Sequence, residues 1–226
     1  MTKVVLIDIE GTIAPISFVK NVLFPYSKKN LPEFLEKNIN QSLIQKIIKE
    51  IENIEGRKLT LNETIEILTK WIEEDKKITP LKELQGLIWK KGFEKGTLKS
   101  PIYNDAYEMI SKWKKDGKKL YIYSSGSVKA QKLFFKYTEK GDLLNLFNGH
   151  FDTKIGNKKE PSSYLRISQQ IRTKPEEITF LSDSPEEITS AAEAGMKVYR
   201  IVRPTDAEYI SNFPFPQVSS FKEVQL

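Results

Sequence analysis

The sequence of 226 residues contains no cysteine and a single histidine, His150. The absence of cysteine excludes disulfide bonds, thiolate nucleophiles and thiolate-bound metals, and it fits a reducing compartment such as the cytoplasm. A single histidine excludes a metal site built from several imidazoles, and any histidine-based triad would depend on that one residue. Any metal or nucleophile that the chain uses must therefore rely on other side chains.

Long apolar runs are also missing, because no segment approaches the ~18 apolar residues of a membrane span. The beginning of the chain lacks the basic-then-apolar order of a signal peptide. We therefore expect a cytoplasmic protein with no membrane partner. A chain of this length fits one large domain, or one core with an inserted subdomain, since domains usually contain ~100–200 residues.

The formal net charge of +6 comes mainly from lysines in short, scattered clusters. Such clusters are found on nucleic-acid-binding surfaces and on ordinary solvated surfaces. No nucleic-acid motif accompanies them, so we expect a solvated surface and no nucleic-acid partner. A positive field would also attract a small anionic substrate toward a cleft.

Residues 17–98 have the apolar spacing of helices. One stripe runs from Leu43 to Ile54, a second from Leu61 to Ile72 and a third from Leu81 to Ile88. Pro80 suits the first turn of the third helix. No strand-like alternation interrupts this stretch, so we predict an all-helical segment.

From Pro101 onward the pattern changes to alternating helices and strands. Strands are expected at 120–123, 150–152, 178–181 and 197–202, and helices at 104–116, 127–137, 161–171 and 185–194. This alternation predicts an α/β fold with a doubly wound parallel sheet, to which the apolar run Val4–Ile7 adds a strand. We therefore predict a discontinuous core, residues 1–16 and 99–226, with residues 17–98 inserted as a helical cap.

Two acids, Asp8 and Glu10, follow the apolar run Val4–Ile7, which has the composition of a strand buried on both faces. If the strand continues through them, their side chains project from the same side, because side chains alternate along a strand. Gly11 then allows a sharp turn, and Thr12 adds a hydroxyl. Two acids crowded at the end of a parallel strand repel each other unless a cation or a catalytic task requires them, so the pattern indicates a functional site.

Two further motifs follow predicted strands, and each has an ordinary alternative. Ser124 and Ser125 precede a glycine and a helix start, where hydroxyls and amides can bind an anion. A serine at this position can also simply cap the helix. Lys158 can neutralise a phosphate and the acids of the first motif, although a solvated loop lysine has the same sequence signature.

A fourth motif places Asp183 after another buried strand. Its carboxylate suits a hard cation such as Mg²⁺. The alternative is that Asp183 caps the next helix while Glu186 and Glu187 favour the positive end of that helix. All four motifs fall at the carboxyl ends of predicted parallel strands, which is the edge where open α/β sheets bind ligands. Taken together, they favour a binding or catalytic site over four coincidences.

The order of these motifs resembles the haloacid dehalogenase superfamily of phosphohydrolases, with an Asp-x-Asp/Glu-x-Thr opening, a Ser/Thr strand end, a lysine and a late acidic pair. Within that superfamily the chain is similar to the enolase-phosphatases of methionine salvage. The likeness extends from the first strand to about Pro204, and its motifs lie at residues 8–12, 15–20, 23–26, 84–89, 123–127 and 149–156. Glu10 is its most specific mark, because most members of the superfamily have aspartate at that position.

The resemblance implies a Rossmann-like core with a helical cap, one Mg²⁺ per subunit and an aspartyl-phosphate intermediate. Asp8 would be the nucleophile, Glu10 would move protons, and Glu187 would support the metal site from outside. The residues implied are Asp8, Glu10 and Lys158 for catalysis; Ser124, Ser125 and Lys158 for substrate binding; and Asp8, Glu10 and Asp183 for the metal, with Glu10 contributing through its backbone carbonyl or as a ligand.

The implied reaction converts 2,3-diketo-5-methylthiopentyl-1-phosphate to the acireductone 1,2-dihydroxy-3-keto-5-methylthiopentene and phosphate. We expect a monomer whose partner is this small phosphorylated substrate. Three alternatives share part of the pattern: a Mg²⁺-dependent phosphatase of another small metabolite, a phosphomutase-like transferase, and a basic binding module without catalysis.

Overall fold

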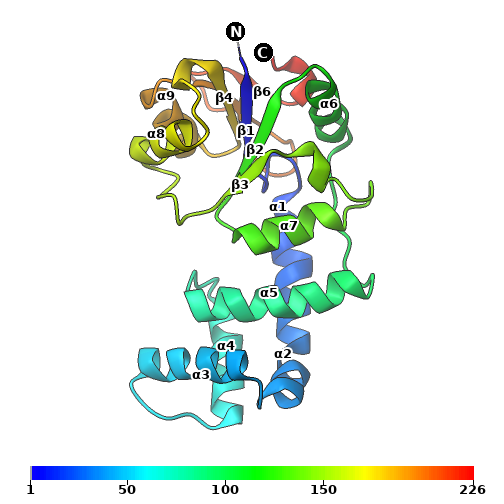
Figure 1. The fold of residues 1–226 in the computed structure, drawn as a ribbon, viewed down its shortest axis with the longest axis vertical. Helices are drawn as coiled ribbons and strands as arrows, with labels where there is room; N and C mark the ends of the chain where they lie inside the picture. The colour runs from blue at the N-terminus through cyan, green and yellow to red at the C-terminus, as the bar shows by residue number, and fades with distance from the viewer. Residues whose placement is uncertain (1) are drawn as a thin grey trace. The chain divides into compact units, whose positions relative to one another are not determined.

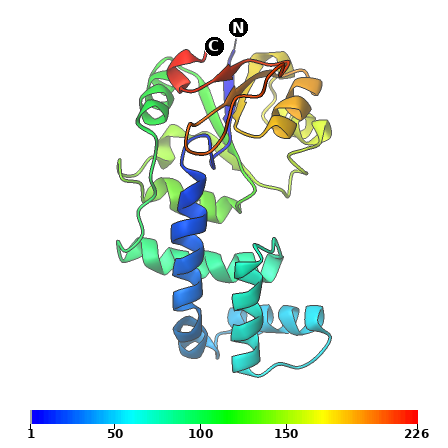
Figure 2. The same cartoon turned by 180° about the vertical axis from the view of Figure 1, so that it is seen from behind.

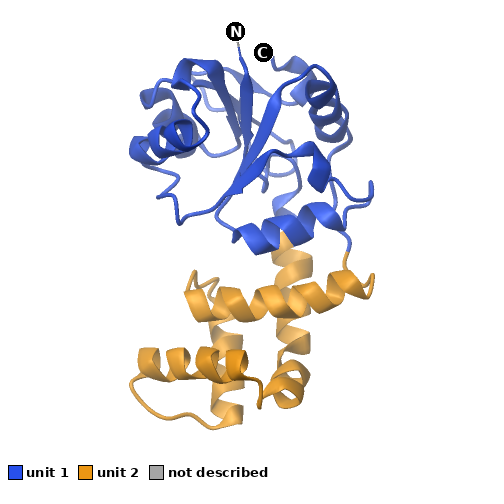
Figure 3. Ribbon diagram, in the orientation of Figure 1, with its two compact units in different colours: residues 1–18, 99–226 blue, residues 19–98 orange. Residues whose placement is uncertain are grey.

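The computed structural model describes residues 2–226. Its contacts separate two compact units, Met1–Phe18 with Lys99–Leu226, and Val19–Leu98 (Figure 3). The predicted domains, 1–16 with 99–226 and 17–98, differ from these units by two residues at the first junction. The role of the helical unit as a cap stays a prediction.

The first unit is built on one sheet of parallel strands in the spatial order β3-β2-β1-β4-β5-β6 (Figures 1 and 2). The strands are β1 Val4–Ile7, β2 Lys119–Tyr123, β3 Gly149–Phe151, β4 Ile178–Ser182, β5 Lys197–Ile201 and β6 Gln217–Val218. The predicted parallel sheet is confirmed, with the first strand of the chain at its centre. Strand β6 was not predicted, because two residues are too few for a recognisable pattern.

Strand β1 is buried on both faces, as its unbroken apolar sequence predicts. Leu6 pairs in register with Phe180 of β4 and belongs to the same buried cluster as Tyr164 and Ile188. Because β1 lies between β2 and β4, the direction in which the chain adds strands reverses there. Open α/β sheets bind ligands outside the carboxyl ends of the strands at such a reversal.

Helices cover both faces of this sheet, with α8 and α9 on one side and α6 on the other (Figures 1 and 2). The longer helices of this unit are α6 Asn104–Lys115, α7 Val128–Lys136, α8 Pro161–Gln170 and α9 Pro185–Glu193. The short helical turns are α1 Ile16–Phe18, η2 Leu144–Leu146, η3 Pro175–Glu177 and η4 Phe221–Glu223. The four predicted helices are confirmed, each starting within one residue of the expected position.

The second unit consists of η1 Val19–Leu23, α2 Phe24–Asn38, α3 Ser42–Glu55, α4 Leu61–Glu73 and α5 Thr79–Glu94. Helix α4 begins with a capping box between Thr60 and Glu63. The α3 stripe is narrower than predicted, since Leu43 and Ile54 are exposed. A short helix such as α3 cannot bury two different faces in the same core, so part of the predicted apolar stripe stays exposed to solvent. Neither these helices nor the others of residues 2–226 are long and apolar enough to cross a membrane.

Candidate active site

Asp8 lies one residue beyond the end of β1, where its N–H donates to the Leu181 carbonyl of β4 at 2.9 Å. The strand does not continue to Glu10, so strand alternation does not set the relative direction of the two acids. Instead residues 9–14 form a tight loop, in which three successive N–H groups donate to the Ile9 carbonyl. Glu10 is half-buried in this loop, two residues after the buried Asp8.

Lys158 is the centre of the site. It is 5% exposed, and its Nζ lies 2.6 Å from Asp8 Oδ1 and 2.7 Å from Glu187 Oε2. Burial lowers the pKa of Lys158, but the charges of Asp8 and Glu187 outweigh it and leave the pKa raised. The Tyr164 hydroxyl donates to the Lys158 carbonyl at 2.7 Å and fixes the backbone of the loop. The alternative of a solvated loop lysine is therefore wrong.

Asp183 follows β4, and its N–H donates to Thr12 Oγ1 at 3.0 Å, which joins the loops after β1 and β4. Burial raises the pKa of Asp183 to about 7, and the negative charges of Asp8 and Glu187 add to that effect while Lys158 opposes it. The helix cap of α9 is Ser184, not Asp183. The capping alternative for Asp183 is therefore wrong.

Glu187 comes from the first turn of α9 and points into the same cluster, where it accepts a hydrogen bond from Ser182 Oγ at 2.8 Å in addition to its contact with Lys158. Burial raises its pKa to about 7, with Lys158 opposing and Asp8 adding to the shift. Glu186 instead remains on the surface, 3.6 Å from Lys159. Only Glu186 fits the alternative in which the two acids merely favour the helix start.

The serines after β2 differ in their contacts. Ser127 caps α7 by accepting the Ala130 N–H. Ser124 is buried and accepts the Gly126 N–H at 3.3 Å, whereas Ser125 is exposed. Since β2 pairs with β1, this loop lies at the same sheet edge as Asp8. The capping interpretation therefore applies to Ser127, and anion binding by Ser124 and Ser125 stays a prediction.

The cluster carries more acid than base. Asp8, Asp183 and Glu187 gather around the buried Lys158, and burial, together with the neighbouring negative charges, raises the pKa of Asp183 and of Glu187. A divalent cation would compensate the excess of acid, and carboxylate oxygens are the ligands that Mg²⁺ prefers. Among residues 2–226 no group of three or more His, Asp or Glu side chains is arranged to hold a metal by itself. Mg²⁺ usually needs only one or two carboxylates, because it keeps several waters. The donor set therefore fits Mg²⁺ with Asp8 and Asp183 as carboxylate donors.

Comparisons with known proteins identify the family of this chain. The haloacid dehalogenase-like hydrolase family matches residues 2–195. Enolase-phosphatase E1 of Persephonella marina is 60% identical, with 99% of each chain covered, and that of Aquifex aeolicus is 56% identical over the whole of both chains. The chain belongs to the enolase-phosphatases of the haloacid dehalogenase superfamily. The crystal structure of the UTR4 protein of Saccharomyces cerevisiae, 34% identical, superposes with a TM-score of 0.86 and covers 99% of this chain and 100% of that one.

The family resemblance, the Rossmann-like α/β fold and the phosphatase class predicted from the sequence are therefore confirmed. This enolase-phosphatase brings Asp8 and Lys158 into direct contact and joins the Asp183 loop to the loop after β1. The individual catalytic and metal-binding roles stay predictions. The single histidine takes no part in the cluster, because His150 Nδ1 contacts the Gln131 side chain and burial lowers its pKa to about 4.

Sequence reasoning missed the residues that hold this cluster in place. Neither Ser182 nor Tyr164 was predicted to support the site. The sequence does show a hydroxyl at the end of a strand and a tyrosine one turn into a helix, which could have indicated them. Two arginines at the end of β5, Arg200 and Arg203, were also missed. Their signal is two arginines at the end of a mostly apolar stretch, residues 198–203.

Gly11 supports the approach of the two loops, and replacing it should harm the site. A methyl group on Gly11 would lie 2.5 Å from Asp183 Oδ2, and its φ of +69° disfavours any L residue. We expect Gly11→Ala to cost about 1–2 kcal/mol of stability through the backbone alone, and also to displace the Asp183 carboxylate. The Mg²⁺ concentration needed for half-maximal phosphatase activity should rise.

Gly117→Ala is the matched control. Gly117 has a φ of +79°, and nothing lies within 4 Å of the added methyl group. The substitution therefore has the same unfavourable backbone conformation as Gly11→Ala but no steric clash. Both variants should lose similar stability in chemical unfolding, and only Gly11→Ala should change the Mg²⁺ requirement. An unchanged Mg²⁺ requirement in Gly11→Ala would contradict the close approach to Asp183.

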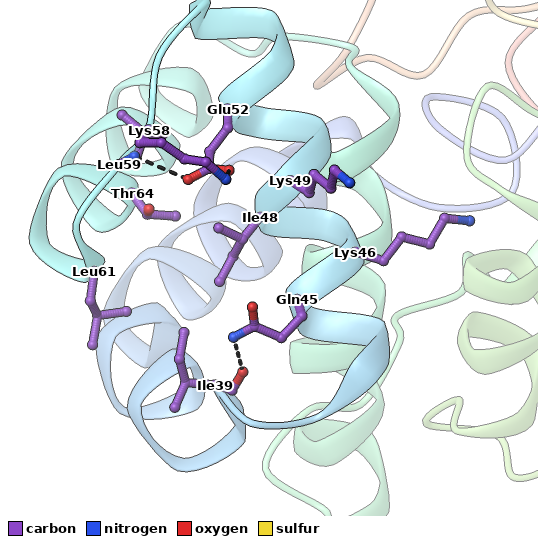
Figure 4. Close-up of a pocket in the computed structure, with 10 residues that line it drawn as sticks. All are labelled: Ile39, Gln45, Lys46, Ile48, Lys49, Glu52, Lys58, Leu59, Leu61 and Thr64. Carbon is purple, nitrogen blue, oxygen red and sulfur yellow. Dashed lines mark hydrogen bonds and ion pairs between the residues drawn. The ribbon is translucent and has the colours of Figure 1, made fainter.

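The helical unit contains an open hollow of about 490 Å³ beside α3 and α4 (Figure 4). It is lined by Ile39, Gln45, Lys46, Ile48, Lys49, Glu52, Lys58, Leu59, Leu61 and Thr64. Its one carboxylate is already used, since Glu52 accepts hydrogen bonds from Lys58 and from the Leu59 N–H. The hollow lacks a cluster of groups suited to catalysis.

Proposed function

We propose that this enolase-phosphatase converts 2,3-diketo-5-methylthiopentyl-1-phosphate to 1,2-dihydroxy-3-keto-5-methylthiopentene and phosphate, with Mg²⁺ as cofactor. The observation that carries the proposal is the buried contact of Asp8 with Lys158, at the carboxyl end of the central strand. A carboxylate oriented by a buried lysine, with a second acid loop beside it, suits attack on a phosphate ester.

In the phosphatase half, Asp8 attacks phosphorus in line and forms an aspartyl-phosphate, while the bond from phosphorus to the substrate oxygen breaks. Glu10 gives a proton to the leaving oxygen. Glu10 then takes a proton from the water that attacks the aspartyl-phosphate, so that inorganic phosphate leaves and Asp8 is restored. The half-buried position of Glu10, two residues after Asp8, supports this assignment.

The phosphate would be held by groups of opposite or complementary charge. Lys158 both orients Asp8 and offers a positive charge to the equatorial oxygens, while Ser124 and Ser125 offer hydroxyl and amide donors. When bound between Asp8 and Asp183, Mg²⁺ would screen the repulsion between the carboxylate and the phosphate. Glu10 would add a further oxygen ligand, through its backbone carbonyl or its side chain.

Enolisation precedes phosphate release and requires a base beside the substrate carbonyl. Glu10 can serve in this role, and a residue of the helical unit is the alternative. We also propose that residues 19–98 serve as a cap that keeps water away from the substrate.

The proposal predicts Mg²⁺-dependent turnover of the diketo phosphate, with transient enol absorbance followed by phosphate release. EDTA should abolish either both the enol absorbance and the phosphate release or the phosphate release alone. Added Mg²⁺ should restore whatever was lost. Weak activity on common sugar phosphates is the matched comparison. Rapid hydrolysis of sugar phosphates, with the diketo phosphate left intact, would favour a phosphatase of another metabolite. Transfer of labelled phosphate to a second hydroxyl would instead favour a phosphomutase.

We further propose that the protein acts as a monomer in the cytoplasm. The absence of cysteine supports that compartment. Light scattering of the purified protein at working concentration tests the monomer, and a stable dimer would contradict it.

A further inference from the structure

Two arginines near the end of β5, Arg200 and Arg203, are each only 4% exposed. Burying a guanidinium is costly unless its donors are all used. The partners of these two side chains therefore indicate what each arginine does in the fold.

Arg203 holds the nucleophile loop. Its Nε and Nη2 donate to the Thr12 carbonyl at 3.2 and 2.9 Å. Its Nη1 donates to both oxygens of Asp105 at 3.0 and 2.9 Å and to the Ser219 carbonyl at 3.1 Å. The guanidinium also lies 4.3 Å from the centre of the Tyr103 ring. One planar fork thus joins the loop after β1 to α6 and to the segment after β6.

Arg200 holds the other loop. Its Nε donates to the Asp183 carbonyl at 2.9 Å, and its Nη1 donates to the Glu208 carbonyl at 2.8 Å and to Gln217 Oε1 at 2.6 Å. Asp183 and Thr12, whose carbonyls the two arginines bind, are also joined by a hydrogen bond, since the Asp183 N–H donates to Thr12 Oγ1 at 3.0 Å.

We propose that Arg200 and Arg203 are positioning residues, which fix the backbones of Asp183 and Thr12 in one register so that the Asp183 carboxylate faces Asp8 across a cation site. The inference rests on the Mg²⁺ site of the proposed function. Arginine suits this task because its donors are arranged in a rigid plane, whereas lysine offers one point charge on a flexible stem. Groups that orient metal ligands from outside typically change metal affinity by about 10–100-fold when they are replaced.

A purely structural role would give a different result. Arg203 also ties Asp105 and Ser219 together, so its loss could lower stability without affecting the site. Arg203→Lys keeps a positive charge beside Asp105 and loses the double contact with Thr12. Arg200→Gln is the second variant, and it loses the contact with the Asp183 carbonyl. Thr179→Val is the control, because it removes a buried hydrogen bond with Thr2, outside the acid cluster and the arginine contacts.

The test measures Mg²⁺ binding to the purified full chain by calorimetry, and hydrogen exchange of the Asp183 amide by NMR without metal. Both arginine variants should weaken Mg²⁺ binding by about tenfold or more and speed exchange of that amide. The kcat should fall more than KM rises, because the serine loop is untouched. Thr179→Val should lose stability with neither effect.

Arginine variants that match Thr179→Val in Mg²⁺ affinity and in amide exchange would overturn the positioning role. Failure of the wild-type protein to bind Mg²⁺ would overturn the metal site of the proposed function instead. In that case faster exchange of the Asp183 amide in the variants still supports the positioning role, and unchanged exchange overturns it.

Discussion

Asp8→Asn is expected to lower phosphate release by about 10⁴-fold or more, since this is the scale of loss when a covalent nucleophile is removed. The amide keeps the shape of the carboxylate and removes its nucleophilic charge. The fold should survive, because Lys158 keeps its contact with Glu187 and one of three mutually repelling acids is neutralised. Acid-quenched wild-type enzyme should carry phosphate on Asp8, detectable by peptide mass spectrometry, and the variant should carry none.

Asp152→Asn is the matched control for this experiment. Asp152 is also buried just beyond a strand of the same sheet, β3, but its carboxylate accepts the N–H groups of Val128 and Lys154. The same chemical change at this position should cost far less activity. Turnover that persists in Asp8→Asn, or a phosphopeptide that maps elsewhere, would remove Asp8 from the role of nucleophile.

The sequence predicts part of this site because the strands of the sheet are parallel. Polar side chains that directly follow buried parallel strands must meet at one edge, so Asp8, Ser124 and Asp183 can be grouped without coordinates. Their ordinary alternatives could be dismissed only from the structure. Asp183 does not cap α9, and Lys158 is not solvated, because each is held by partners distant in the sequence.

Other features were beyond sequence reasoning for physical reasons. Strand periodicity could not give the direction of Glu10, because β1 ends at Ile7 and a tight loop replaces the strand. The contacts of Arg203 depend on segments more than 90 residues away, Thr12 and Asp105, and no local pattern encodes such partners. Strand β6 forms only because β5 offers it an edge, which a sequence of two residues cannot indicate.

Position in the sheet also explains how distant segments of the chain form one small cluster. The chain order reverses between β1 and β4, so the loops after these strands approach each other without a helix between them. The Thr12–Asp183 hydrogen bond closes that gap, and Lys158 reaches in from the loop before α8. Asp8, Asp183 and Lys158 thus come from three distant segments of the chain.

Lys158→Met should affect both stability and catalysis, and in a way that separates the two roles of the lysine. Removing one partner from a buried ion pair typically costs about 3–5 kcal/mol, because the remaining charges lose their compensation. The raised pKa of Lys158 means that its contribution is complete below the unfolded lysine pKa of about 10.4 and is lost only as pH rises through the higher folded value. Unfolding measured at pH 7 therefore reports it in full.

The catalytic effect of Lys158→Met should be a loss of about 10²–10³-fold in kcat, as for other removed donors that stabilise a developing charge. Mg²⁺ binding should respond in the opposite direction. Without the lysine, Asp8, Asp183 and Glu187 present more uncompensated negative charge, so the variant should bind Mg²⁺ at least as tightly as the wild type. Mg²⁺ at 100 times its Kd should then restore about 2.7 kcal/mol of stability.

Lys118→Met is the control for these measurements, since Lys118 donates to the Thr2 carbonyl and faces no acid in that contact. It should show a small loss of stability, with normal activity and normal Mg²⁺ affinity. The decisive combination for Lys158→Met is a slow enzyme that still binds Mg²⁺ tightly. Weaker Mg²⁺ binding in this variant would mean that the lysine maintains the shape of the cation site rather than opposing its charge. Unchanged kcat would exclude Lys158 from phosphate binding, because a buried cation in contact with the nucleophile could not then participate in the transition state.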